Sequence, residues 1–217
     1  MAVRVVPLRP DQWRQAGAMM GRAFAADPVR RALLPAESRR SAQLEIQFQM
    51  GIRQAVVDGM VVDTTPSLGA VAVWVPPGHP TAPSLRAVWA NAPLTLRWLR
   101  VSTLGDLGRA VALMQRYERR HRAVMPGPHW YLEMLGVDPV KQRFGLGAVL
   151  VRHGLERAEG DGLPAYVETE TPANQAFYSK LGFRTAHHTS ARDEPLGVPT
   201  WCLVRDPPVP ASWLRPT

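Results

Sequence analysis

The chain has 217 residues and a formal net charge of +8, and 46% of its residues are hydrophobic, which suits one domain with a full core over residues 1–217. The positive charge comes from scattered arginines without a helix-turn-helix, zinc-finger or aromatic-platform pattern, so we expect no nucleic-acid partner. No apolar run approaches the length of a membrane helix and the N-terminus lacks a signal-peptide core, so we expect a cytoplasmic protein with no membrane partner.

The first part of the chain predicts strands and amphipathic helices. Asp11 is expected to cap a helix that ends before Asp27-Pro28. Further on, apolar residues recur at helical spacing, and two short apolar runs flank Pro66-Ser67 as paired strands. In chain order we predict a strand at 3–8, a helix at 11–26, a helix at 41–57, strands at 60–64 and 69–75, and helices at 85–99 and from 104.

The second part alternates strands with helices, which is typical of an α/β fold. Its last strand contains the single cysteine, Cys202, for which we predict a buried, inert thiol. One cysteine excludes an internal disulfide and a cysteine-based zinc cluster, and we expect no metal. The predicted elements are a strand at 130–137, a helix ending near 160, a strand at 164–170, a helix at 172–181, and strands at 183–188 and 200–204.

A glycine-rich turn, Gln142-Arg-Phe-Gly-Leu-Gly147, lies between a predicted strand and a predicted helix. Free N–H groups and the dipole at a helix N-terminus favour a phosphate, and glycine lets the backbone approach it closely. The spacing matches neither the phosphate loop of NTPases nor the dinucleotide fingerprint. The turn therefore predicts a site for another phosphorylated cofactor, the alternative being an ordinary glycine turn.

A second motif follows about thirty residues later. Thr171 is expected to cap a helix that starts at Pro172 and ends at Gly182. This segment contains the pattern Asn174-x-x-Phe-Tyr-x-x-x-Gly-Phe183. The two motifs, in this order and at this separation, resemble the two cofactor motifs of the GNAT acyltransferase superfamily. The resemblance covers nearly the whole chain, and the overall layout looks most like the puromycin N-acetyltransferase-like branch.

The resemblance implies a single GNAT-type α/β domain. Its sheet is mixed and mostly antiparallel, with a splayed parallel strand pair and helices on both faces. A helical insertion, residues 79–128, falls between the third and fourth main strands, and residues 206–217 form a Pro-rich C-terminal tail.

The insertion carries apolar stripes at helical spacing, which contain Trp89, Trp98, Leu104, Leu107, Val111 and Met114. Such stripes can pack on their own domain, cover an acceptor site or form a homodimer surface. We favour packing on the same domain, because an apolar helical face usually belongs to a core.

The resemblance also implies acetyl-CoA as the acyl-donor cosubstrate. In such a site the pantetheine arm lies between the two splayed strands, where main-chain groups of Leu135 and Val137 would line it. The Leu135 N–H would polarise the thioester carbonyl. The cofactor-binding residues implied are Leu135, Val137, Gln142, Arg143, Phe144, Gly145, Leu146, Gly147, Ala148, Asn174, Phe177 and Tyr178.

Two catalytic residues are predicted. The resemblance makes Tyr178 the acid that protonates the leaving thiolate, the alternative being a packing role. Strand alternation places Glu133 on one face with Tyr131, Leu135 and Val137, nearest to the carbonyl site. Glu133 is thus either the base or an anchor for a cationic substrate; Glu168 on the neighbouring strand and water are the other candidate bases.

We therefore predict an acyl-CoA-dependent N-acetyltransferase that acts on a primary amine of a small molecule. Transfer would be direct, within a ternary complex, because Cys202 is not near the motifs and no other cysteine is present. The alternatives are a protein or peptide acetyltransferase (lysine or N-terminal) and a non-catalytic acyl-CoA-binding sensor. No motif identifies the acceptor.

Overall fold

The computed structural model describes residues 3–207, and a seven-stranded sheet forms its centre. The strands are β1 Val6–Pro7, β2 Val61–Thr64, β3 Ala70–Val75, β4 Trp130–Val137, β5 Ala165–Thr169, β6 Arg184–Thr189 and β7 Thr200–Arg205. Their order is β1-β2-β3-β4-β5-β7-β6, and β4 and β5 are parallel while the other neighbours are antiparallel. Most of the predicted tail, 208–217, lies outside the described residues.

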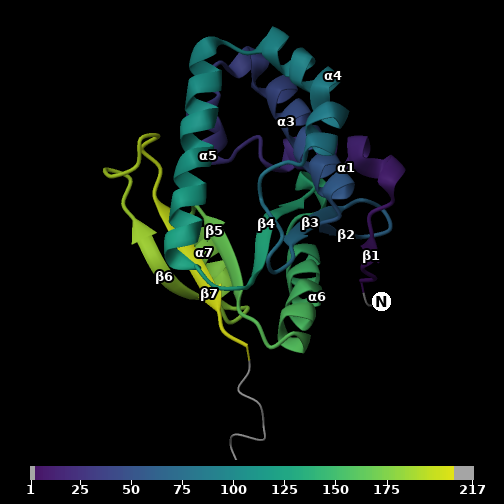
Figure 1. Ribbon diagram of the computed structural model, residues 1–217, viewed down its shortest axis with the longest axis vertical. Coiled ribbons are helices and arrows are strands. Elements are labelled where there is room, and N and C mark those ends of the chain that lie inside the picture. The colour runs from purple at the N-terminus through teal and green to yellow at the C-terminus, as the bar shows by residue number, and fades with distance from the viewer. Residues whose placement is uncertain (1–2, 208–217) are drawn as a thin grey trace, which may run out of the picture.

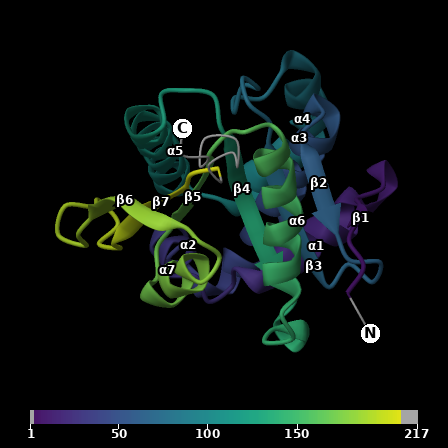
Figure 2. The same cartoon turned by 90° about the horizontal axis from the view of Figure 1, so that it is seen from below.

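Helices cover both faces of the sheet (Figures 1 and 2). On one face lie α1, α3 and the insertion helices, and on the other lies α6. This arrangement confirms the predicted fold class, including the helical insertion between the third and fourth strands. The helices are α1 Trp13–Ala23, α2 Pro28–Leu33, α3 Glu37–Asp58, α4 Leu85–Val101, α5 Leu104–Val124, α6 Leu146–Gly160 and α7 Pro172–Ser179, with 3-10 turns η1 Pro10–Gln12 and η2 Pro139–Lys141.

Strand β3 separates two hydrophobic cores. Every residue of β3 is buried, because the strand lies mid-sheet with helices on both sides. Val71 and Val73 pack in the core beneath α1, α3 and α4, whereas Ala72 and Trp74 pack in the core beneath α6. The alternation of side chains along the strand thus builds both layers of the domain.

Two contacts hold α6 against the sheet. A methyl group at Gly154 would overlap the Trp74 ring, so glycine permits the close approach of helix and strand. One turn later, Arg157 makes a two-pronged ion pair with the buried Asp63 of β2, at 2.6 and 3.1 Å. These contacts hold α6 on the sheet and thereby position its N-terminus, which follows the glycine-rich turn.

One expectation about the N-terminal helices is wrong, and one helix was not predicted. Asp11 does not cap α1; it lies within η1 and pairs with Arg9 at 3.3 Å. The Asp27-Pro28 pair does more than end a helix. The Asp27 carboxylate accepts the Arg30 N–H at 2.9 Å and caps α2, which the sequence analysis did not predict.

The predicted packing of the insertion holds for α4 only in part. Trp98 is buried against the core, but Trp89 is 79% exposed. The stripe predicted on α5 faces solvent, since Leu104 is 88% exposed and Met114 66% exposed, and Leu107 and Val111 are exposed as well. The inward side of α5 carries Ala110 and Leu113 on the core together with polar and charged side chains, which pair with carboxylates at the end of β5 and on the β6–β7 connection.

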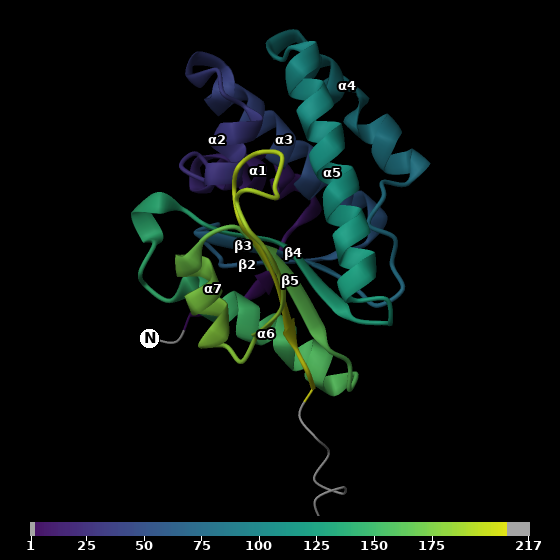
Figure 3. The same cartoon turned by 90° about the vertical axis from the view of Figure 1, so that its left-hand side faces the viewer.

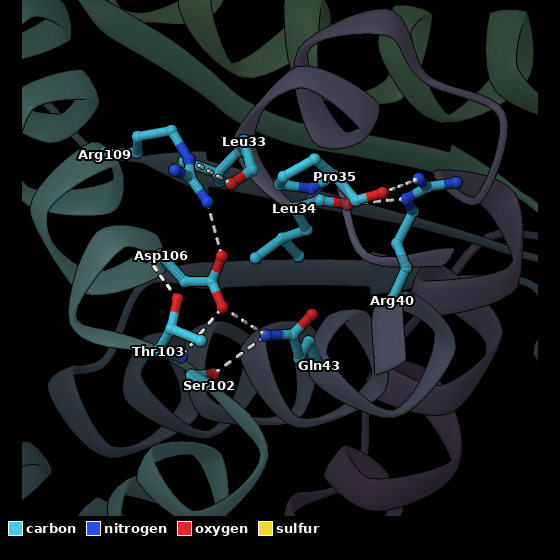
Figure 4. Close-up of polar contacts among 9 residues, drawn as sticks. All are labelled: Leu33, Leu34, Pro35, Arg40, Gln43, Ser102, Thr103, Asp106 and Arg109. Atoms are coloured by element: carbon cyan, nitrogen blue, oxygen red, sulfur yellow. Dashed lines mark hydrogen bonds and ion pairs between the residues drawn. The ribbon is translucent and has the colours of Figure 1, made fainter. Parts of the chain in front are cut away.

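A buried carboxylate anchors the start of α5 (Figure 4). Asp106 accepts the Thr103 N–H at 2.8 Å and the Gln43 side-chain amide at 3.1 Å, and it pairs with Arg109. Arg109 in turn donates to the Leu33 carbonyl at 2.8 Å. The network ties α5 to α2 and α3, and so sets which face of α5 turns toward the sheet.

Replacing Gly154 with alanine tests the close packing of α6. Gly154→Ala should lower the free energy of unfolding by about 1–3 kcal/mol, the usual range for overpacking a core. Gly160→Ala is the matched control in the same helix, because nothing lies within 4 Å of its added methyl group. Thermal unfolding measures both variants, and equal stabilities would contradict this account of the α6–β3 contact.

Candidate active site

The parallel strands β4 and β5 separate after three paired residues. Trp130, Tyr131 and Leu132 pair with residues 165–167, and the register ends there. Beyond this point β4 stays paired with β3 as far as Val137, while β5 stays paired with β7 as far as Thr169. The two strands therefore diverge and leave a wedge between them.

A β-bulge in β4 lies at the start of this wedge. The register with β3 runs from Leu132 opposite Trp74 to Met134 opposite Val73, so Glu133 is the additional residue. The bulge reverses the alternation of side chains: Leu135 packs in the α6 core, whereas Tyr131 and Met134 pack against the core beneath α1 and α3. The expected common face for Tyr131, Glu133, Leu135 and Val137 is therefore wrong.

The main chain of β4 still presents its polar groups to the wedge. The Val137 carbonyl accepts the Gln142 side-chain amide at 3.3 Å, so it points away from β3. Backbone groups along an antiparallel strand alternate in direction, and Leu135, two residues earlier, points the same way as Val137. Both predicted main-chain positions thus face the space where β5 has turned away.

The glycine-rich turn forms the far end of this space. Arg143 and Gly145 adopt left-handed conformations with φ of 69° and 77°, and α6 begins directly afterwards. The Val149 N–H is the donor that reaches the Gly145 carbonyl, at 3.1 Å. The N–H groups of residues 146–148 precede this first helical bond, so they are available to an anion. With Lys141 and Arg143 nearby, the turn fits a pyrophosphate.

Packing brings the two sequence motifs together. The nearest neighbours of a methyl group placed on Gly147 would be Val137 at 3.4 Å, Phe177 at 3.7 Å and Leu135 at 3.8 Å. Leu146, Ala148 and Tyr178 belong to the same core. Phe144 is 75% exposed at the tip of the turn, and Asn174 is exposed on α7.

Tyr178 lies on the buried side of α7. Its ring is 5.0 Å from that of Phe177 and 5.6 Å from that of Phe183. Thr171 caps the helix by accepting the Asn174 N–H at 3.1 Å, as predicted. Burial, together with the negative charge of Glu170, raises the pKa of Tyr178 well above its ordinary value. The phenol therefore stays protonated at every working pH.

Glu133 is a half-buried carboxylate on the bulge. Burial raises the pKa of Glu133 to about 7, and His79 is the neighbouring group whose charge lowers it. Such a carboxyl group gains and loses its proton near neutral pH, as a general base requires.

Two more carboxylates, one on β5 and one directly after it, reach the same side of the sheet. Glu168 accepts the Tyr166 hydroxyl at 2.8 Å and lies 3.6 Å from Arg120 of α5, and Glu170 accepts the Tyr117 hydroxyl at 2.6 Å. Burial raises the pKa of each carboxylate to about 7. The sequence analysis missed Glu170, Tyr117 and Arg120, although alternation along β5 places Glu170 on the face of Glu168.

The comparisons with known proteins agree with this geometry. The family model described as "Acetyltransferase (GNAT) family" matches residues 76–183, about half of the chain. That segment contains β4, the glycine-rich turn, β5 and α7. The chain belongs to the GNAT acetyltransferase family.

Individual relatives of this GNAT protein are distant. A mycothiol acetyltransferase of Streptomyces coelicolor is 44% identical over 59 residues, which is 26% of this chain and only 19% of that protein. A structure described as histone acetyltransferase HPA2 and related acetyltransferase from Corynebacterium glutamicum has a TM-score of 0.68 at 21% identity, covering 97% and 99% of the two chains. A polyamine N-acetyltransferase of Drosophila melanogaster has a TM-score of 0.62 at 12% identity, covering 94% and 100%. The two structures establish the fold.

The single cysteine bears on the chemistry of the GNAT domain. Cys202 is buried, as predicted, and burial raises its pKa to about 11, so the thiol stays protonated and is a poor nucleophile.

Across residues 3–207, none of the helices has the length and apolar character needed to cross a membrane.

A charge placed in the turn tests the pyrophosphate site. A Cβ added at Gly145 would have nothing within 4 Å, and both Asp and Asn tolerate the left-handed conformation of this residue. Gly145→Asp should weaken coenzyme A binding about tenfold or more relative to Gly145→Asn, because the two side chains differ mainly in charge. Isothermal calorimetry gives the two affinities. The same affinity in both variants would remove the pyrophosphate from this turn.

Proposed function

We propose that this protein is an acetyl-CoA-dependent N-acetyltransferase that acts on a primary amine of a small molecule by direct attack within a ternary complex. The observation that carries the proposal is the wedge between β4 and β5, with the α6 N-terminus at one end. Family membership supports the acyl donor. The low thiol acidity of Cys202 disfavours a covalent acyl-enzyme.

The chain offers a contact for each part of the donor. The N–H groups at the start of α6 would bind the pyrophosphate, and the open main-chain groups of β4 would bind the pantetheine arm. The Leu135 N–H would donate to the thioester carbonyl and stabilise the negative charge that develops there. Asn174, exposed on α7, would contact the arm from the other side.

Tyr178 is the proposed acid. As the amine nitrogen bonds to the acetyl carbon and the carbon–sulfur bond breaks, Tyr178 would give its proton to the departing sulfur. Its raised pKa ensures that the proton is present, and the rings of Phe177 and Phe183 hold the phenol in place.

Glu133 is the proposed base, and it would take the proton of the acceptor's ammonium group directly or through water. Glu168 is less suited to that role, because one of its oxygens accepts the Tyr166 hydroxyl and the Arg120 guanidinium lies 3.6 Å from the other. The bulge removes the shared face with Leu135, so the support for Glu133 is its position at the start of the wedge and its pKa of about 7.

The cluster of carboxylates favours a cationic acceptor. Glu133, Glu168 and Glu170 all act on the pKa of the Tyr131 phenol, so their negative charges surround one part of the site. An ammonium group would be attracted there, and the polyamine substrate named for one structural relative fits the same charge pattern.

We retain the puromycin N-acetyltransferase-like branch as the proposed subfamily. A peptide acceptor and a non-catalytic sensor are the competing functions.

Removing one hydroxyl group tests the acid. Tyr178→Phe keeps the ring and its packing but deletes the proton donor. Turnover should fall about a hundredfold, within the usual range for general acid catalysis, while acetyl-CoA affinity stays the same. Thiol release with a panel of small amines measures the rate. Full turnover in the variant would return Tyr178 to a packing role.

The pH dependence tests the base. Glu133 must be ionised to accept a proton and its pKa is about 7, so kcat should rise as pH increases through 7. Glu133→Gln should remove that rise, lower kcat most near neutral pH, and recover partly at high pH, where free amine is available. A variant that raises only the KM of the acceptor would make Glu133 a substrate anchor instead.

A further inference from the structure

An apolar cavity lies next to Tyr117, whose hydroxyl donates to Glu170. It has a volume of about 150 Å³ and lies between α2, α5 and the connection from β6 to β7. Figure 3 shows that connection, in yellow, rising past β5 toward α2 and α5. The apolar side chains that line the cavity belong to Val29, Ala112, Leu113, Leu196 and Val198.

The charged groups around the cavity are already paired. Arg109 binds Asp106 and the Leu33 carbonyl, and Arg116 binds Glu194 at 2.7 Å. The second oxygen of Glu194 lies 2.9 Å from Arg120. These pairs fix the β6–β7 connection over the cavity, and they leave its interior suited to an uncharged group.

Tyr117 connects the cavity to the carboxylates. Its side chain lines the cavity, while its hydroxyl donates to Glu170 at 2.6 Å. Glu170 directly follows β5, two residues before α7 begins, and α7 carries Tyr178. An apolar group in the cavity would therefore lie one tyrosine ring away from Glu170, whose negative charge also acts on Tyr178.

We propose that this cavity binds the apolar part of the acceptor amine, a phenyl ring or a short branched alkyl group, and that Glu170 holds the acceptor's ammonium group. The volume matches that of apolar cavities known to hold one benzene ring. The inference rests on the proposed function and adds a substrate class to it. Tyr117 positions Glu170, and the insertion helix α5 sets the size of group that is accepted.

Filling the cavity tests the inference. Ala112 lines the cavity although its side chain is exposed, and Ala112→Phe adds a ring to that lining; Val111→Phe, one residue earlier and not part of the lining, is the control. In the wild type, kcat/KM should be at least about tenfold higher for benzylamine than for methylamine. The phenyl ring buries more apolar surface than one methylene group, which alone changes kcat/KM by about tenfold or more. Ala112→Phe should lower kcat/KM for benzylamine about tenfold and leave methylamine and coenzyme A binding unchanged. Equal effects of the two variants would overturn the cavity assignment.

Direct binding separates this inference from the proposed function. Calorimetry of benzylamine binding to the full chain requires no acetyl transfer. Binding that is lost in Ala112→Phe and kept in Val111→Phe would support the cavity even if no amine were acetylated, in which case the proposed function alone would fail. Undetectable binding to the wild type, or binding unchanged in Ala112→Phe, would overturn the inference. Glu170→Gln should raise the KM for benzylamine about tenfold with kcat nearly preserved; a loss of kcat alone would contradict the ammonium role.

Discussion

The divergence of β4 from β5 is the constraint on which the site depends. Each strand has a second antiparallel neighbour, β3 for β4 and β7 for β5, and those ladders continue after the parallel pairing stops at Leu132 and Val167. The sheet therefore stays intact, while the β4 main chain beyond Leu132 has no strand on the side where β5 lay. Unpaired backbone groups are costly unless another partner satisfies them, and a pantetheine arm carries amides suited to that role. In the proposed function, the wedge, α6 and α7 act as one binding site.

The insertion contributes to this site through its charged face rather than its apolar one. Asp106 and Arg109 fix the start of α5 on α2 and α3, and three turns later Tyr117 and Arg120 meet the carboxylates of β5. Burying so many charged groups is favourable only because each has a partner. The same pairing holds the β6–β7 connection over the apolar cavity. Acceptor selection can thus change through α5 while the wedge for the acyl donor stays constant.

Much of this arrangement could be predicted from sequence, because glycine turns and helix caps are local signals. The turn at Gly145, the Thr171 cap and the order of elements follow from neighbouring residues alone. The bulge at Glu133 has no such signal: it depends on the register with β3, more than fifty residues earlier. The orientation of α5 was mispredicted for a related reason, since the partners of its polar face lie on β5 and beyond. Asp27-Pro28 is also a local signal for the cap of α2, but the sequence analysis uses that pair only as the end of a helix.

Backbone amide hydrogen exchange, measured residue by residue with and without coenzyme A, tests the central claim most directly. If the acyl donor lies in the wedge, amides of residues 135–137 and 146–148 should become strongly protected, and those of β2 should not change. The Leu135 amide should gain further protection with acetyl-CoA, because its N–H would bind the acetyl carbonyl. Protection confined to another part of the chain, with the wedge and the start of α6 unchanged, would contradict the account.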